Sequence, residues 1–148
     1  DFDDKELNEP QNPRSGSNPP KPKKPSIMSR FAKRHGFRID NENRFYHDNG
    51  NFIERSSVRP LWERRNVNGE LVFYYLARDH CLEKKPLEIA AEIWGLIEKY
   101  PEKYALILLS IDDEPIEIIG TKLSKMKDAG QITLYPATYR LVYDNMTQ

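Results

Sequence analysis

Apolar and polar positions alternate in short runs from Gly36 to Leu76, and polar turns separate these runs. Such alternation is typical of β-strands with one buried face. Two of the turns contain Asn-Gly, at Asn49-Gly50 and at Asn68-Gly69. Asn-Gly favours a two-residue hairpin because both positions tolerate a positive φ. This part of the chain therefore predicts an antiparallel β-meander.

The pattern changes after Pro86, which suits the first turn of a helix because proline lacks the N–H that would stay unpaired there. One helical face collects apolar residues, namely Leu87, Ala90, Ala91, Trp94 and Ile97. We therefore expect one long apolar helix that Pro101 ends. The later patterns predict a β-hairpin over 104–119, a short helix over 121–129 and a C-terminal β-hairpin over 132–143. The predicted fold class is α+β.

The first 29 residues have a different composition. Six of the 11 prolines lie between Pro10 and Pro25, and apolar side chains are nearly absent before Ile27. Such a segment buries too little surface to offset its ordering entropy. The sequence therefore predicts a disordered Pro/Lys-rich arm over 1–29 and a single α+β domain over 30–148. The chain starts at Asp1 rather than Met, so we also expect a fragment or a processed product.

Charge is segregated along the chain, although 23 Lys and Arg balance 23 Asp and Glu. Acids dominate residues 1–9, whereas residues 10–38 contain basic residues and no acid. The remainder is mildly acidic. A basic arm on an acidic body says more about binding partners than about the fold.

Basic side chains interleaved with aromatic ones suit nucleic acid, because cations pair with phosphates and rings stack on bases. We expect contacts from the basic residues of the arm, with Phe31 beside them. The candidates are Lys21, Lys23, Lys24, Arg30, Phe31, Lys33, Arg34 and Arg38. Two alternatives stay open: the arm docks on an acidic protein surface, or it is a solvated linker whose cations contact the acidic body.

A weaker candidate for chemistry is Asp79-His80, expected in a loop where a strand gives way to the helix. The pair resembles the Asp-His of HNH-type nucleases, which implies a metal site. Such sites also use a second His or Asn at the helix. No His follows His80 in this chain, so Glu83 or Glu88 would have to substitute.

Other patterns have plain structural interpretations. Cys81 is expected to be buried and inert, and the acids 112–114 to form a solvated turn. Trp62 to Tyr75 is similar to the first hairpin of a WW domain, but the strand with a second Trp does not follow. Tyr139, Leu141 and Tyr143 share one face of the last predicted strand, which is either core or a protein interface.

These observations predict a non-enzymatic accessory module of a larger assembly that acts on nucleic acid. The alternative is a protein-interaction module that docks through the arm or the tyrosine-rich strand, and a metal-dependent nuclease is a distant third. We expect no cofactor, no resident metal and no membrane partner, since no run of about 18 apolar residues occurs. One cysteine excludes an internal disulfide, which favours an intracellular, cytoplasmic or nuclear setting.

Overall fold

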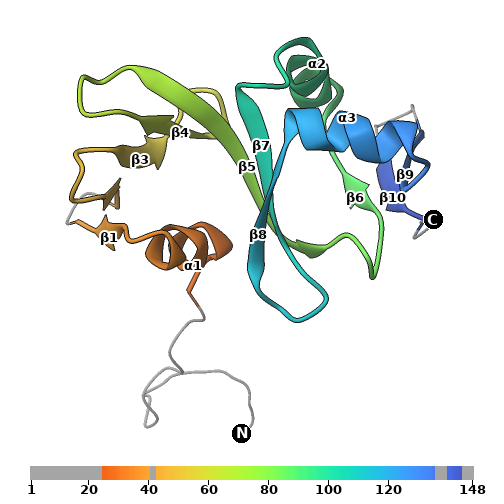
Figure 1. Ribbon diagram of the computed structural model, residues 1–148, viewed down its shortest axis with the longest axis horizontal. Coiled ribbons are helices and arrows are strands. Elements are labelled where there is room, and N and C mark those ends of the chain that lie inside the picture. The colour runs from red at the N-terminus through yellow and green to blue at the C-terminus, as the bar shows by residue number, and fades with distance from the viewer. Residues whose placement is uncertain (1–24, 41–42, 136–139, 145–148) are drawn as a thin grey trace, which may run out of the picture.

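The computed structural model describes residues 25–40, 43–135 and 140–144, and it is a mixed α+β structure (Figure 1). The helices are α1 (Ile27–Arg34), α2 (Ala91–Lys99) and α3 (Gly120–Asp128). The strands of the large sheet are β1 (Arg38–Ile39), β2 (Phe45–Tyr46), β3 (Phe52–Arg55), β4 (Trp62–Arg65), β5 (Leu71–Cys81), β7 (Tyr104–Leu109) and β8 (Pro115–Ile119). A smaller sheet contains β6 (Leu87–Glu88), β9 (Ile132–Tyr135) and β10 (Arg140–Tyr143).

The large sheet has the strand order β1-β2-β3-β4-β5-β7-β8. Consecutive strands from β1 to β5 pair antiparallel. The chain then leaves the sheet through β6 and α2 and returns as β7, which pairs parallel with β5. A parallel return requires a crossover of this length, because a tight turn joins only antiparallel strands. β8 completes the sheet antiparallel to β7.

The two Asn-Gly turns are confirmed. Gly50 and Gly69 adopt φ values of 92° and 80° in the β2–β3 and β4–β5 connections. Gly50 also lies against Val67, where an added Cβ would come within 2.6 Å of a Val67 methyl carbon. Glycine is therefore needed at position 50 for its conformation and for its small volume.

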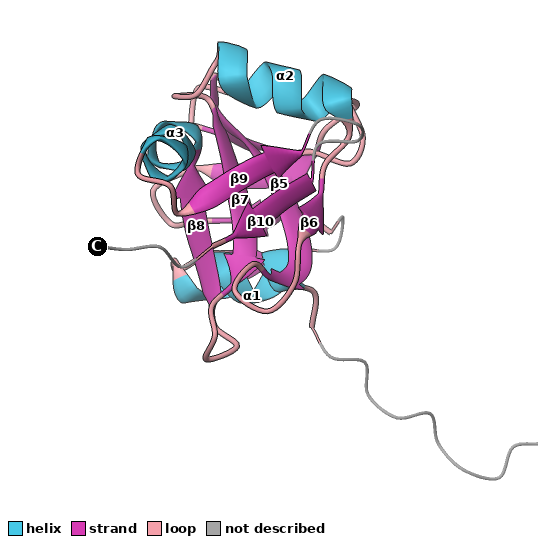
Figure 2. Cartoon of the chain, turned by 90° about the vertical axis from the view of Figure 1, so that its right-hand side faces the viewer, coloured by secondary structure: helices cyan, strands magenta, loops and turns pink. Residues whose placement is uncertain are grey.

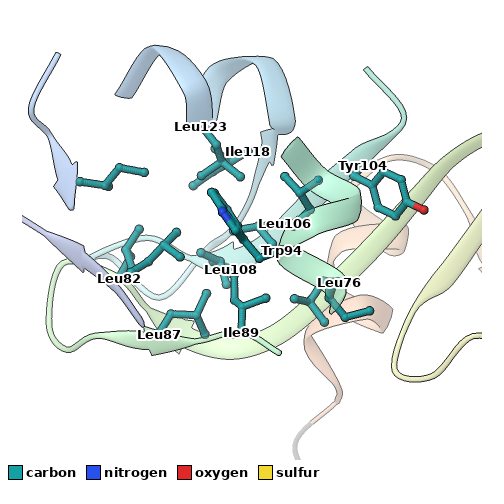
Figure 3. Packing of buried hydrophobic residues seen from close by; sticks show 14 of the residues in the cluster. Leu76, Leu82, Leu87, Ile89, Trp94, Tyr104, Leu106, Leu108, Ile118 and Leu123 are labelled. Carbon is teal, nitrogen blue, oxygen red and sulfur yellow. The ribbon is translucent and has the colours of Figure 1, made fainter. Parts of the chain in front are cut away.

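Apolar residues cover both faces of the sheet, and β7 contributes to each. Leu106 and Leu108 belong to the cluster under α2, α3 and the small sheet, and Trp94 of α2 lies at its centre (Figure 3). Ala105 and Ile107 belong to the cluster that α1 covers. Figure 2 shows α1 on one side of the strands and α2 with α3 on the other. All six residues of β7 are buried, as its apolar sequence predicts.

The predicted long apolar helix is wrong. Leu87 and Glu88 form the strand β6, paired with β10, and the helix α2 begins only at Ala91 and has nine residues. Leu87 and Ile89 are buried while Glu88 is exposed. That alternation has the period of a strand, and the pairing of Leu87 with Leu141 uses it.

Two further expectations are corrected. Asp79 and His80 belong to the long strand β5 and not to a loop before a helix. Residues 27–29, assigned to the disordered arm, open α1, and Ile27 and Met28 are buried. The ordered part therefore begins before residue 30. Residues 1–24 lie outside the described part of the chain.

Candidate nucleic-acid interface

The helix α1 turns part of the predicted basic arm into a rigid surface. The Ser26 hydroxyl oxygen accepts a hydrogen bond from the Ser29 N–H at 3.1 Å and caps the helix. One face is apolar and buried, and it consists of Ile27, Met28, Phe31 and Ala32. Lys33 and Arg34 lie exposed in the last turn, where they also complement the helix dipole. The apolar face therefore fixes the directions in which the cations point.

Two shallow hollows lie along the exposed side of α1 and share Ser29 and Lys33. The first, of about 390 Å³, is lined by Ser29, Lys33, Phe37, Arg38, Ile39 and Phe45. The second, of about 430 Å³, is lined by Pro25, Ser29, Arg30, Lys33, Arg34, Glu114 and Pro115. We call the two together the α1 groove. It runs from the start of β8 past α1 to β1 and β2.

Four basic side chains line the α1 groove. Arg30, Lys33, Arg34 and Arg38 line it, and Glu114 is the acid among its lining residues. Lys33 is exposed and, within the described part of the chain, forms no ion pair. Ile39, with 60% of its surface exposed, adds an apolar patch at one end. A groove of this kind suits an extended anion with an apolar component.

The three arginines of the groove already contact acids of the same chain. Arg30 donates to the main-chain carbonyl oxygen of Asp113 and lies 3.8 Å from its carboxylate. Arg34 pairs with the Glu114 carboxylate. Arg38 Nη2 lies 2.6 Å from Asp48 Oδ1. The linker alternative expected basic side chains to contact the acidic body, and these three do.

A buried tyrosine lies beneath α1. Arg64 Nη1 donates a hydrogen bond to the Tyr75 hydroxyl at 3.2 Å. Burial raises the pKa of Tyr75 above its ordinary value of 10.0. The Tyr75 ring in turn packs edge-on against Phe31 at 5.6 Å between centroids. The Arg64–Tyr75 hydrogen bond joins β4 and β5 under the helix.

Phe31 does not have the predicted role. It is 1% exposed and lies in the core between α1 and the sheet. Its ring belongs to the apolar face that α1 packs against the sheet. It therefore cannot stack on a base while the helix stays in place. The alternation of aromatic and basic residues in this segment comes from an amphipathic helix. Lys21, Lys23 and Lys24 lie outside the described residues, so for them the prediction stays a prediction.

The second candidate site is not assembled into a metal centre. Asp79 is exposed, and His80 Nε2 lies 2.8 Å from the Lys85 carbonyl oxygen, in a contact that closes the turn after β5. No group of three or more His, Cys, Asp or Glu side chains suited to a metal ion occurs among residues 25–40, 43–135 and 140–144. A nuclease reaction through this pair has no supporting geometry in that part of the chain.

The remaining candidates have structural roles. Trp62 and Tyr75, from the segment similar to a WW hairpin, are buried. Cys81 is a buried free thiol, as expected. On the last strand Leu141 is fully buried and Tyr143 packs against the same core, while Tyr139 lies outside the described residues. The described part of the tyrosine-rich strand therefore faces the interior.

Sequence reasoning missed the acids that pair with the arginines of the α1 groove. Asp113 and Glu114 were recognised as part of a solvated turn, yet they are 80 or more residues away from their arginine partners along the chain. Asp48 lies beside an Asn-Gly turn and was not considered. One signal was available in the sequence. Arg30 and Arg34 lie one helical turn apart, and the acidic turn with Asp113 and Glu114 precedes an edge strand.

Comparison of the chain with protein-family models, with curated proteins and with solved structures found no match. None of the helices in the described ranges has the length and apolar character needed to cross a bilayer. The α1 groove, by its geometry and charge, is therefore the basis of the functional proposal.

Proposed function

We propose that this protein is a non-enzymatic module that binds nucleic acid through the α1 groove, as an accessory part of a larger assembly. The observation that carries the proposal is Lys33, an exposed cation without an ion pair in the described structure, which lines both hollows of the groove. Arg34 and Arg38 lie on either side of it as further phosphate contacts. Arg30 supports the surface from beneath.

The shape and charge of the α1 groove favour a polyanion over a small anion. The two hollows lie next to each other and share Ser29 and Lys33, and four cations line them. An extended strand brings several phosphates to several cations at once, and each contact releases counterions. Ile39 supplies an apolar contact for a sugar or a base at one end.

The arm lysines would add to the cations of the α1 groove. Lys21, Lys23 and Lys24 come shortly before Pro25 in the sequence, and Pro25 lines the α1 groove. We expect these lysines to add phosphate contacts to those of the groove. The proposal therefore divides the binding energy between a rigid surface on α1 and the cations that precede it.

The competing proposal is that the α1 groove docks an acidic protein surface. A specific observation favours it: Arg34 and Arg38 accept carboxylates as partners within the chain itself. Carboxylates and phosphates are both good acceptors for a guanidinium group. A protein partner would present spaced acids and an apolar side chain opposite Ile39.

The experiment is fluorescence anisotropy of labelled single-stranded RNA, single-stranded DNA and duplex DNA over a range of salt concentrations. Lys33→Ala should weaken binding several-fold for all sequences and reduce the slope of log K against log salt by about 1. The matched control is Lys125→Ala, since Lys125 is an exposed lysine of α3 on the other side of the sheet.

Equal effects of Lys33→Ala and Lys125→Ala would contradict the groove as the site, because only net charge would then count. No salt-sensitive binding to any of the three nucleic acids at low salt would overturn the proposal. In that case a stable complex with an acidic protein that Lys33→Ala weakens would support the protein-docking alternative.

A further inference from the structure

The turn between β7 and β8 places an acid inside the cationic groove. Glu114 is one of the residues that line the second hollow, and its carboxylate pairs with Arg34 of α1. Any polyanion that lies along α1 must meet this carboxylate. A negative charge at this point opposes the function that the surrounding cations favour.

The two arginines that contact this turn differ in how they are held. Arg30 has a side chain that is 21% exposed, and it is held twice: it donates to the main-chain carbonyl oxygen of Asp113 and lies 3.8 Å from the Asp113 carboxylate. Arg34 and Glu114 have side chains that are each 55% exposed, and their contact is a pair of charged side chains. Arg30 therefore anchors the helix to the turn, whereas the Arg34–Glu114 pair is open to exchange.

The fold does not depend on the exchangeable pair. Four buried apolar residues of α1 hold the helix on the sheet, and Arg30 adds its contact to Asp113. Exposed ion pairs contribute little to the free energy of folding because water and salt screen them. Arg34 can therefore change its partner without loss of the helix.

We propose that Glu114 is an internal competitor for the bound polyanion: it holds Arg34 in the free protein and gives Arg34 up to a phosphate on binding. This inference rests on the proposed function. A phosphate can replace the carboxylate because both pair strongly with a guanidinium group, and because Lys33 and Arg38 hold other phosphates of the same strand. The exchange breaks the Arg34–Glu114 pair, so it lowers the affinity of the protein for a polyanion. Glu114 thereby sets how strongly a ligand must interact with Arg34 in order to bind.

The test compares Glu114→Gln with Asp112→Asn in the full chain, using the same labelled single-stranded and duplex probes. Both variants remove one negative charge from the same turn, but the exposed Asp112 forms no ion pair in the described part of the chain. We expect Glu114→Gln to tighten binding about three- to tenfold at low salt. Asp112→Asn should tighten it less than twofold, because only long-range charge changes.

A double-mutant cycle then assigns the effect to the pair. In the Arg34→Gln background, Glu114→Gln should change the affinity by less than twofold, since the residue that it releases is gone. Circular dichroism and the urea midpoint of each variant verify that all of them fold. A cycle of this kind separates competition for Arg34 from a general rise in positive charge.

The outcomes separate the two proposals. If the wild-type protein binds with a salt slope that Lys33→Ala reduces, but Glu114→Gln and Asp112→Asn tighten binding equally, the competitor role is wrong and the proposed function stands. The competitor role is also wrong if Glu114→Gln acts as strongly without Arg34 as with it. Absence of binding by every variant, Glu114→Gln included, overturns the proposed function and the inference with it.

Discussion

Among the arginines near α1, the degree of exposure separates structural from exchangeable contacts. Arg64 lies partly buried beneath the helix, where it donates to Tyr75 and its guanidinium lies over the Phe37 ring at 5.3 Å. Arg30 is mostly covered, whereas Arg34 and Arg38 are open to water. The chemistry of the residue type is the same in all four. Their roles differ because water competes for the exposed pairs and not for the buried ones.

Tyr75 provides a prediction at this scale. Tyr75→Phe removes the hydroxyl that accepts a hydrogen bond from Arg64, at a residue that is fully buried. The free energy of unfolding should fall by about 1–2 kcal/mol. Urea denaturation at pH 7 measures the change. Tyr135→Phe, at a half-exposed ring, is the control and should have little effect.

The same residue predicts how stability depends on alkaline pH. Burial holds the pKa of Tyr75 above its ordinary value of 10.0. As pH rises above 10, the unfolded chain releases this proton while the folded protein keeps it. The unfolded state then binds fewer protons, so the free energy of unfolding declines until the pH passes the folded pKa. Urea midpoints from pH 8 to 11 should decline less steeply for Tyr75→Phe than for the wild-type protein. Parallel curves for the two proteins would show that Tyr75 titrates normally.

Helix α3 shows how closely an element can approach its neighbours when its first residue lacks a side chain. Gly120 opens α3 directly against Pro101, and an added Cβ would lie 2.5 Å from the Pro101 carbonyl oxygen and 2.7 Å from its Cα. Both contacts are to backbone, which cannot rotate away. Gly95, in the middle of α2, has open space at the same position. The two glycines therefore call for opposite predictions.

Gly120→Ala should lower the free energy of unfolding by about 1–3 kcal/mol, because α3 must move away from Pro101. Gly95→Ala should raise it by about 0.5–1 kcal/mol, because alanine loses less backbone entropy in a helix and meets no neighbour. Urea denaturation of both variants gives the two signs under identical conditions. A stabilising Gly120→Ala would mean that the α3–Pro101 contact is looser than the structure has it.

At the scale of helices and strands, the sequence predicted correctly those elements whose formation depends on neighbouring residues. The Asn-Gly turns, the apolar strand β7 and the helix α3 followed from residue types within a few positions. The prediction for the segment from Pro86 to Ala91 was wrong because its pattern is ambiguous. Leu87 and Ala91 fit one face of a helix, whereas Leu87 and Ile89 fit one face of a strand. Pairing with β10, more than 50 residues later, resolves that ambiguity. No local pattern contains this information.

The helix α1 was missed for a different reason. Ser26 as N-cap and the apolar pair Phe31 and Ala32, one turn after Ile27 and Met28, are an ordinary amphipathic signal. The proline- and lysine-rich composition of the preceding residues predicted disorder and masked this helical signal. The groove along α1 was therefore not predicted, although its four cations, Arg30, Lys33, Arg34 and Arg38, were among the candidate residues. The partners of those cations come from the β7–β8 turn and from the β2–β3 turn, and only the fold brings them together.

In the molecule as a whole, α1 has to be part of the folded structure for the groove to exist. Its buried residues complete the cluster on one face of the large sheet, in contact with β5, β7 and β8. Removing residues 1–35 would take the helix away and expose that cluster to water. The loss of Phe31 alone would cost about 3–5 kcal/mol, as is usual for a buried phenylalanine. A deletion that tests the arm must therefore end at residue 24.

Deleting residues 1–24 should leave the free energy of unfolding of the remaining chain within about 0.5 kcal/mol of the wild-type value, since α1 and both apolar clusters are retained. Binding to single-stranded RNA or DNA should weaken, and the salt slope should fall by about 0.7–0.9 for each arm lysine that contacts a phosphate. The matched variant replaces Lys21, Lys23 and Lys24 with alanine in the full chain, which keeps the acidic residues 1–9. If the lysines make the contacts, the triple variant reproduces the lower slope. If the slope stays at the wild-type value in the triple variant, the groove on α1 binds the nucleic acid without the arm.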